Sequence, residues 1–315
     1  MYNNSMGQNG KLKLFIAGLA ALILIAATVS YLIIIRNGSD LPSEDAIGET
    51  VQSGIAVLET VDIQPSETTS AAQTEVRTDY SDYPLNTPSD CQAVIDQYAA
   101  DHGLESYAYP MEIVNLLMSN HETLDFVLHY PEAVGTQDSA DYPGTIDVSG
   151  DYSPVRMPEY YQYDIRWGYK SYGGSVMGMT GGGPTTLSMV ASYLLSNPDL
   201  NPAWMAGYAE NNGFMIDGGT DWMLMTEGAI GLGIDVTPIT ADRDRVDRNL
   251  DVGNVIVCLM GPGDFTDTVQ FIVIAGKTDD GYVIRDPGSP SRTAATWDFD
   301  TIASQMTGCW VMRVL

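Results

Sequence analysis

The feature that most constrains this chain is a run of apolar residues near its start. From Leu14 to Ile35 the sequence reads LFIAGLAALILIAATVSYLIII, without a charged side chain. A helix needs about 20 such residues to cross the ~30 Å hydrocarbon core of a bilayer, so the run predicts a transmembrane helix over 14–35. A cleaved signal peptide is the alternative, since Ala26 and Ala27 are small, but its apolar core usually has only ~7 to 15 residues.

Charge predicts the orientation of this helix. Lys11 and Lys13 precede it, whereas the 41 acidic residues all follow it, so the positive-inside rule places residues 1–13 in the cytoplasm and the C-terminal part outside the cell. This arrangement is compatible with a Gram-positive surface protein, single-pass in the cell membrane. The net charge of -27 argues against a nucleic-acid partner, because phosphate backbones would be repelled.

Composition divides the extracellular part into three regions. Residues 36–87 are rich in Ser, Thr, Asp and Glu and lack periodicity, which predicts a disordered acidic stalk. Residues 88–150 predict a helical segment, with a first helix capped by Ser89 and ending near Gly103. The three histidines, His102, His121 and His129, lie here without the spacing of a zinc site, so we expect no metal and no cofactor.

The third region, 151–315, contains three consecutive glycines, Gly181 to Gly183, followed by Pro184 and an apolar period typical of a buried helix. We place Pro184 at the first helical position, which suits a residue without an N–H. A phosphate loop would need a lysine after the glycines, and none follows. A simple tight turn and a catalytic elbow remain as alternatives.

The rest of this region predicts helices first and strands second. Helices are indicated after Asn201-Pro202 and Thr220-Asp221, and a solvated charged turn at DRDRVDR, 242–248. Three or four strands are indicated next, in the segments NVIVCLM, QFIVIAG, GYVIRDP and CWVMRVL. Cys258 and Cys309 lie in two of these strands and are expected to be core thiols. The pattern predicts an α+β fold with the central helix packed on an antiparallel sheet.

Three segments carry a family resemblance. They are QYDIRWGYKSYGGSVMGMTGGGPTTLSMVASYLL, GGTDWMLMTEGAIGLGI and GDFTDTVQFIVIAGKTDDGYVIRDPGS. They resemble the papain-like cysteine peptidases of the bacteriocin-processing branch, the thirty-ninth cysteine-peptidase family. In that family a Gly-Cys-Gly-Pro-Thr segment carries the nucleophile, a Gly-His-Phe strand the base, and an Asp-Pro pair the group that orients the base.

The resemblance implies a degenerate site. The nucleophile position is Gly182, the histidine position is Gln270, and the orienting position is Asp286, which matches. The position of an oxyanion glutamine, six residues before the nucleophile, is Val176. The resemblance further implies a substrate groove, formed by Gly181, Gly183, Pro184, Thr185, Trp167 and Tyr172.

Gly182 offers no thiolate, and Gln270 cannot exchange a proton near neutral pH, so hydrolysis by this site is not expected. Thr180, Thr185 and Ser188 would each need a stronger base than Asp286. The first hypothesis is therefore a catalytically inactive, membrane-anchored module that binds a peptide or protein ligand. The alternative is an active hydrolase that uses acidic residues or the region near His121, and a purely structural role for a stalked surface domain also remains open.

Overall fold

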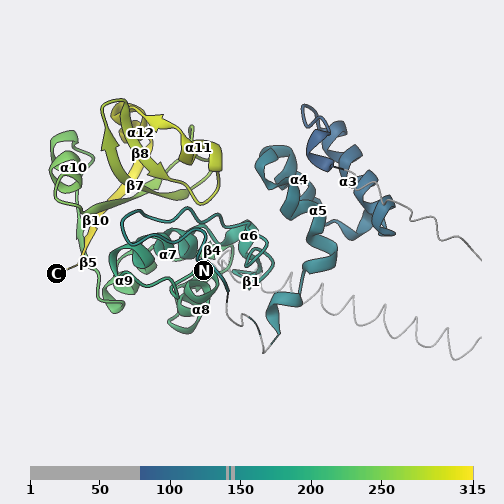
Figure 1. Cartoon of the computed structure of the whole chain (residues 1–315), viewed down its shortest axis with the longest axis horizontal. Coiled ribbons are helices and arrows are strands. Elements are labelled where there is room, and N and C mark those ends of the chain that lie inside the picture. The colour runs from purple at the N-terminus through teal and green to yellow at the C-terminus, as the bar shows by residue number, and fades with distance from the viewer. Residues whose placement is uncertain (1–78, 140–141, 143–145, 315) are drawn as a thin grey trace, which may run out of the picture. The chain divides into compact units, whose positions relative to one another are not determined.

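The computed structural model describes residues 79–139, 142 and 146–314, which belong to one compact unit spanning Val76–Leu315 (Figure 1). The predicted transmembrane helix at 14–35 and most of the predicted stalk lie outside these residues. Among the helices that are described, none is both long and apolar enough to cross a membrane.

The first part of the described chain is helical, as predicted. Its helices are α3 (Pro88–His102), α4 (Met111–Ser119) and α5 (Leu124–Ala133), with short 3-10 turns η1 (Tyr80–Asp82), η2 (Ser106–Ala108), η3 (His121–Thr123) and η4 (Thr136–Asp138). The predicted cap of the first helix was wrong by two residues. Thr87 accepts from the Asp90 N–H and the Asp90 carboxylate accepts from the Thr87 N–H, which forms a capping box, whereas Ser89 lies inside the first turn. Gly103 ends α3 as predicted.

The second part is built around a six-stranded antiparallel sheet. The strand order is β5-β10-β6-β7-β8-β9, with bounds β5 (Asp235–Pro238), β6 (Val255–Met260), β7 (Gln270–Thr278), β8 (Gly281–Arg285), β9 (Thr296–Trp297) and β10 (Met306–Arg313). The four predicted strands are β6, β7, β8 and β10. Small two-stranded sheets, β1 (Ser171–Tyr172) with β2 (Ser175–Val176) and β3 (Met215–Ile216) with β4 (Gly219–Thr220), lie outside the large one.

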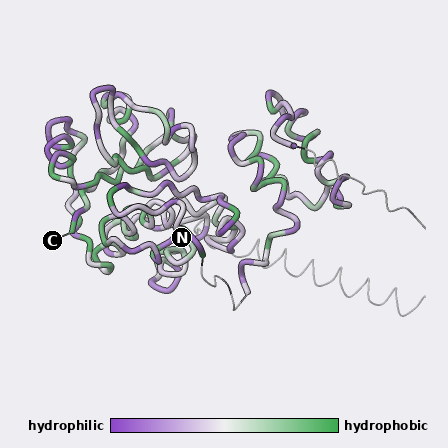
Figure 2. The backbone as a smooth tube through the Cα atoms, viewed as in Figure 1, coloured by the Kyte–Doolittle hydropathy of each residue, from purple (hydrophilic) through white to green (hydrophobic). Residues whose placement is uncertain are grey.

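Both faces of the sheet are buried, and side chains alternate between them. On β6, Val255, Val257 and Leu259 enter the larger core, whereas Ile256, Cys258 and Met260 enter a second core. Figure 2 shows the central strands as hydrophobic stretches between more hydrophilic connections. Strands covered on both faces read as continuous apolar runs, which is why they were recognisable in the sequence.

Helices cover each face. The larger core includes α7 (Gly182–Leu194), α8 (Pro202–Asn211), the turn η5 (Trp222–Met225) and α9 (Glu227–Gly231), and α6 (Met177–Thr180) precedes α7. The second core includes α10 (Arg243–Leu250) and α12 (Phe299–Gln305), and α11 (Pro290–Ala294) follows β8. The predicted charged turn at 242–248 was wrong: it is helix α10, whose one buried residue, Val246, packs into this core.

Candidate functional site

The glycine at the predicted nucleophile position begins the central helix. Gly182 is the first residue of α7, so Pro184 is the third residue of this helix. We had predicted Pro184 at the first position. Gln270 is the first residue of β7, and it lies directly beside Gly182. A Cβ atom built on Gly182 would lie 2.7 Å from Gln270 Oε1 and 3.0 Å from Gln162 Oε1. The structure therefore brings together Gly182 and Gln270, which are 88 residues apart in the sequence.

Asp286 completes this arrangement. It directly follows β8, and its carboxylate is fully buried. Arg292 Nε donates to Asp286 Oδ2 at 2.6 Å, and the Gly288 N–H donates to Oδ1 at 2.7 Å. Burial raises the pKa of Asp286, while the Arg292 guanidinium, the Gly288 N–H and the Gln270 amide act in the opposite direction. Gln270 thus lies against Asp286, which also binds Arg292, a partner that we had not predicted.

Gln162 is the member of the site that sequence reasoning missed. Its Nε2 donates to Gly178 O at 3.0 Å and to Met179 O at 3.4 Å, and its backbone N–H donates to Pro287 O at 2.8 Å. Its Oε1 is buried and has no hydrogen-bond partner among the described residues. Val176, where we had looked for a glutamine, is a buried apolar residue of β2. Gln162 precedes Gly182 by 20 positions, so only the fold reveals their contact.

The hydroxyl groups near Gly182 are not activated nucleophiles. Thr180 Oγ1 donates to the backbone oxygens of Tyr172, at 2.8 Å, and Val176, at 3.1 Å. Ser188 Oγ is buried and donates to Leu200 O at 2.6 Å. Thr185 Oγ1 is buried without a partner in the described part of the chain. A hydroxyl nucleophile needs a base that accepts its proton, and among the described residues none of these three hydroxyls donates to a side-chain base.

The predicted groove walls belong to the core. Trp167 is 0% exposed and its indole N–H donates to Tyr161 O, while Tyr172 is 2% exposed and its hydroxyl lies 2.9 Å from Thr220 Oγ1. The remaining four predicted groove residues are buried as well: Gly181, Gly183, Pro184 and Thr185. All six residues are therefore packed inside the protein, and their role in a substrate groove stays a prediction. Their role in this structure is to pack the N-terminal end of α7 into the protein.

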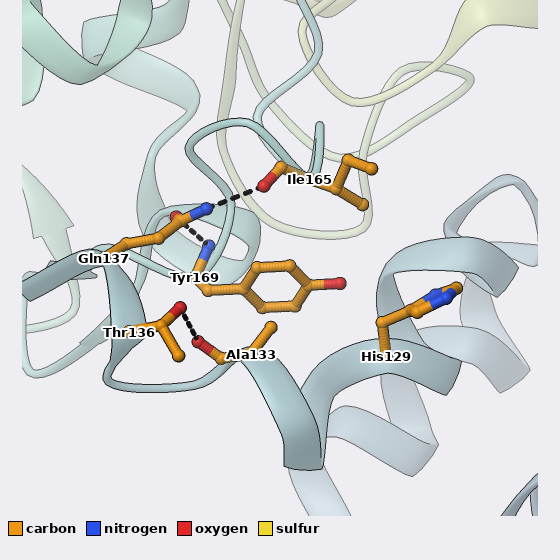
Figure 3. Close-up of a pocket in the computed structure, with 6 residues that line it drawn as sticks. All are labelled: His129, Ala133, Thr136, Gln137, Ile165 and Tyr169. Atoms are coloured by element: carbon orange, nitrogen blue, oxygen red, sulfur yellow. Dashed lines mark hydrogen bonds between the residues drawn. The ribbon is translucent and has the colours of Figure 1, made fainter. Parts of the chain in front are cut away.

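A pocket of about 270 Å³ lies elsewhere, at α5 and η4 (Figure 3). It is lined by His129, Ala133, Thr136, Gln137, Ile165 and Tyr169. The side-chain amide of Gln137 already has hydrogen-bond partners: its Nε2 donates to Ile165 O at 2.7 Å, and its Oε1 accepts from the Tyr169 N–H at 3.0 Å. Both ends of the Gln137 side-chain amide are therefore already paired within the protein. Within the described ranges, no group of three His, Cys, Asp or Glu side chains gathers to hold a metal.

Fold and site together define an α+β domain in which a helix N-terminus faces the start of a sheet strand, with a buried aspartate behind that strand. This arrangement is consistent with a papain-like peptidase fold. Among solved structures, the chain is similar to the peptidase domain of Streptococcus ComA, which is described as a bifunctional ABC transporter involved in a quorum-sensing pathway. The identity is 24%, the match covers 43% of this chain and 92% of that domain, and the TM-score is 0.35. A likeness of this size establishes neither family membership nor activity.

No family model matches the sequence, and no curated protein sequence matches it.

Proposed function

We propose that residues 151–315 form a peptidase-like domain that binds a peptide or protein ligand without hydrolysing it. The observation that carries this proposal is the contact between Gly182 and Gln270. These residues stand at the helix N-terminus and the facing strand, where a cysteine peptidase needs a thiol and an imidazole.

Neither residue supplies a reacting group. Glycine has no side chain, and an amide can donate and accept hydrogen bonds but cannot take up a proton near neutral pH. Asp286 is a poor substitute base because its carboxylate is already bound by Arg292 and by the Gly288 N–H. Proteases that lose their catalytic groups keep backbone donors and binding surfaces, which supports binding as the remaining activity.

The experiment that tests this proposal measures binding and turnover together. We expect members of a random peptide library to be retained by the immobilised domain and recovered intact, with no cleavage in a fluorogenic peptide library between pH 5 and 9. Cleavage that survives metal chelation and thiol-blocking reagents would support the alternative, a hydrolase that uses other residues. Failure to retain any peptide would leave a structural role as the better account.

We also propose that the span at 14–35 anchors the domain to the outside of the cell membrane. The support is the apolar run and the two lysines before it. Protease added to intact cells should release a fragment that begins within residues 37–87. Protection of the acidic domain from the protease would show that the orientation in the membrane is the opposite one. A mature chain that begins near residues 27–31 would indicate a cleaved signal peptide.

A further inference from the structure

We infer that Cys258 and Cys309 form a dithiol site, which a small disulfide such as oxidised glutathione converts into a disulfide bond between β6 and β10. The inference is independent of the proposed binding function. It follows from the backbone pairing of the two strands, from the face of the sheet on which the two thiols lie, and from the position of the third cysteine.

The two cysteines are direct partners across the sheet. Strands β6 and β10 are antiparallel, and Cys309 of β10 stands opposite Cys258 of β6. Side chains that stand directly opposite each other project from the same face of a sheet. Both thiols accordingly belong to the same buried core, on the face that α10 and α12 cover. The sheet therefore places the two sulfur atoms side by side in one apolar cluster.

The pair occupies the closer of the two kinds of antiparallel position. The Cys309 carbonyl accepts a hydrogen bond at 2.9 Å from the N–H of Ile239, the residue that directly follows β5. The N–H and C=O of one strand residue point to the same side, so Cys309 directs both groups toward β5 and away from β6. In such a non-hydrogen-bonded pair the Cα atoms are ~4.5 Å apart and the side chains are closest. This separation lies within the range of about 4.4–6.8 Å that a disulfide bond allows.

The third cysteine is held away from this pair. Cys91 lies on α3 and is buried among residues of the helical segment, in a different cluster from the other two thiols. Its thiol donates to Leu85 O at 3.9 Å. The folded chain therefore selects the pairing of Cys258 with Cys309 over either pairing of Cys91.

The oxidation consists of two thiol–disulfide exchanges. The thiolate of one cysteine attacks a sulfur of oxidised glutathione, which forms a mixed disulfide and releases one glutathione thiolate. The other cysteine then loses its proton, attacks the protein sulfur of the mixed disulfide and releases the second glutathione thiolate. The two protons from the cysteines end on the two released thiolates. Two protein thiols are thus oxidised to one disulfide, and one oxidised glutathione is reduced to two molecules of glutathione.

The burial of the two thiols determines when this reaction takes place. Cys258 is 0% exposed and Cys309 is 5% exposed, so a molecule the size of glutathione does not reach either sulfur in the folded protein. Burial raises the pKa of Cys258 well above its usual value, and the neighbouring Cys309 thiol raises it further, so the folded pair also keeps its protons. The site therefore reacts during folding, before the sheet and its covering helices close over the thiols.

The test refolds the full chain, in a mild detergent, from guanidinium chloride at about pH 8 in a mixture of oxidised and reduced glutathione, where thiols with a pKa of ~8.5 are partly ionised. Remaining thiols are then blocked with N-ethylmaleimide in denaturant, and mass spectrometry of unreduced peptides identifies the bonds. We expect the Cys258–Cys309 bond in roughly tenfold excess or more over either bond to Cys91, because the fold holds the second thiol beside the mixed disulfide. Blocked thiols at Cys258 and Cys309, lasting glutathione adducts on both, or a main product bonded to Cys91 would overturn the inference.

A stability measurement and two variants complete the test. If the fold brings the two sulfurs together, the bond must in turn stabilise the fold, so the oxidised protein should have a higher guanidinium midpoint than the reduced protein. A lower midpoint would show that the fold opposes the bond and would overturn the inference. Cys91→Ala is the matched control and should form the bond to the same extent, whereas Cys309→Ala should abolish it. If Cys309→Ala does not fold, the peptide map and the midpoint of the unaltered chain still decide the question.

Discussion

At the scale of single residues, Gly182 shows how neighbouring side chains pack against a glycine at the start of a helix. Gln270 Oε1 and Gln162 Oε1 lie 2.7 Å and 3.0 Å from the place of a Cβ atom on Gly182, so two neighbouring side chains occupy the space next to this glycine. Both oxygens belong to the far ends of flexible side chains. A side chain at 182 would therefore displace an amide and leave the backbone in place.

The first prediction restores the two reacting groups. In the double variant Gly182→Cys with Gln270→His, we expect iodoacetamide to alkylate the new thiol at pH 6 faster than free cysteine. The helix N-terminus and an adjacent imidazolium both stabilise the thiolate, whereas an ordinary thiol with a pKa of ~8.5 is almost fully protonated at that pH. Mass spectrometry of the peptide that contains residue 182 measures the rate.

The native cysteines provide the background for this experiment. Cys91, Cys258 and Cys309 are buried, and burial raises the pKa of Cys258 well above its usual value, so they should stay unlabelled in the folded protein. Gly182→Cys alone, with Gln270 retained, is the matched control and should react slowly. Labelling of the double variant at the rate of free cysteine would show that the positions do not form a preserved active-site frame.

The second prediction concerns Arg292, whose side chain is 27% exposed while that of Asp286 is 0% exposed. Arg292→Met leaves a buried carboxylate without its cation, and we expect the free energy of unfolding to fall by about 3 kcal/mol at pH 7. This value is at the low end for a buried ion pair because the arginine is partly hydrated. Arg156→Met is the control, because its pair with Glu159 is exposed and 4.0 Å long, and should cost less than about 1 kcal/mol.

The stability lost in Arg292→Met should depend on pH. Burial raises the pKa of Asp286 in the folded protein, so the stability associated with its protonated form is complete below the unfolded pKa of ~3.9 and falls as pH rises through the folded pKa. Removing Arg292 raises the folded pKa further. The loss in Arg292→Met should therefore be smaller at pH 4.5 than at pH 7.5, as measured by denaturant unfolding, and an equal loss at both values would contradict it.

At the scale of elements, the helical segment is attached to the loop that carries the site. Glu122, in η3, accepts from the Ser291 N–H at 2.7 Å and from the Ser289 hydroxyl, and so caps the first turn of α11. Asn120 Nδ2 donates to Gly288 O at 2.9 Å. Two side chains from the turn between α4 and α5 thus hold the loop that follows Asp286.

The third prediction removes this cap. Glu122→Ala should destabilise the protein by about 1 kcal/mol, the usual cost of losing a side-chain acceptor at a helix N-terminus. It should also accelerate amide hydrogen exchange at residues 289–292 more than elsewhere. Glu105→Ala is the control, because Glu105 is exposed and makes no side-chain cap. Unchanged exchange at 289–292 would show that the contact does not hold the loop.

How far the sequence predicted these elements depended on where their stability comes from. β6, β7, β8 and β10 were predicted because burial on both faces requires runs of Val and Ile. The edge strands β5 and β9 are only four and two residues long and owe their conformation to pairing with β10 and β8, which leaves no local pattern. Helix α10 was missed because only Val246 on it is buried.

The residues of the candidate site also divide into those that were predicted from the sequence and those that only the fold reveals. The family resemblance implied that Gly182, Gln270 and Asp286 lie together, whereas Gln162 and Arg292 reach them only through the tertiary fold. We assigned Trp167 to a groove wall, whereas the structure buries it, because large aromatic residues are also the ones that pack cores. Aromatic residues near a motif do not by themselves distinguish a core from a groove.

At the scale of the whole molecule, the helical segment and the peptidase-like part share a core. Phe126 of α5 stacks on Tyr169 with ring centroids 4.8 Å apart, and a Cβ on Gly178 would overlap the Phe126 ring. The same cluster of buried residues contains Val94 of α3 and Val176 of β2. The predicted boundary near residue 150 therefore lies inside one compact unit.

The last prediction is that this unit unfolds in a single transition. All five tryptophans lie at or beyond Trp167, so tryptophan fluorescence reports only on the part that follows the helical segment. If the shared core couples the two parts, Phe126→Ala should lower the stability measured by fluorescence by about 3 to 5 kcal/mol, the cost of deleting a large buried ring. The fluorescence and far-ultraviolet circular dichroism curves should coincide, as two-state unfolding requires. Tyr107→Ala is the control, because Tyr107 is 86% exposed and its loss should change neither curve. An unchanged fluorescence midpoint in Phe126→Ala, with earlier loss of helical signal, would show instead that the helices are a separately folding attachment.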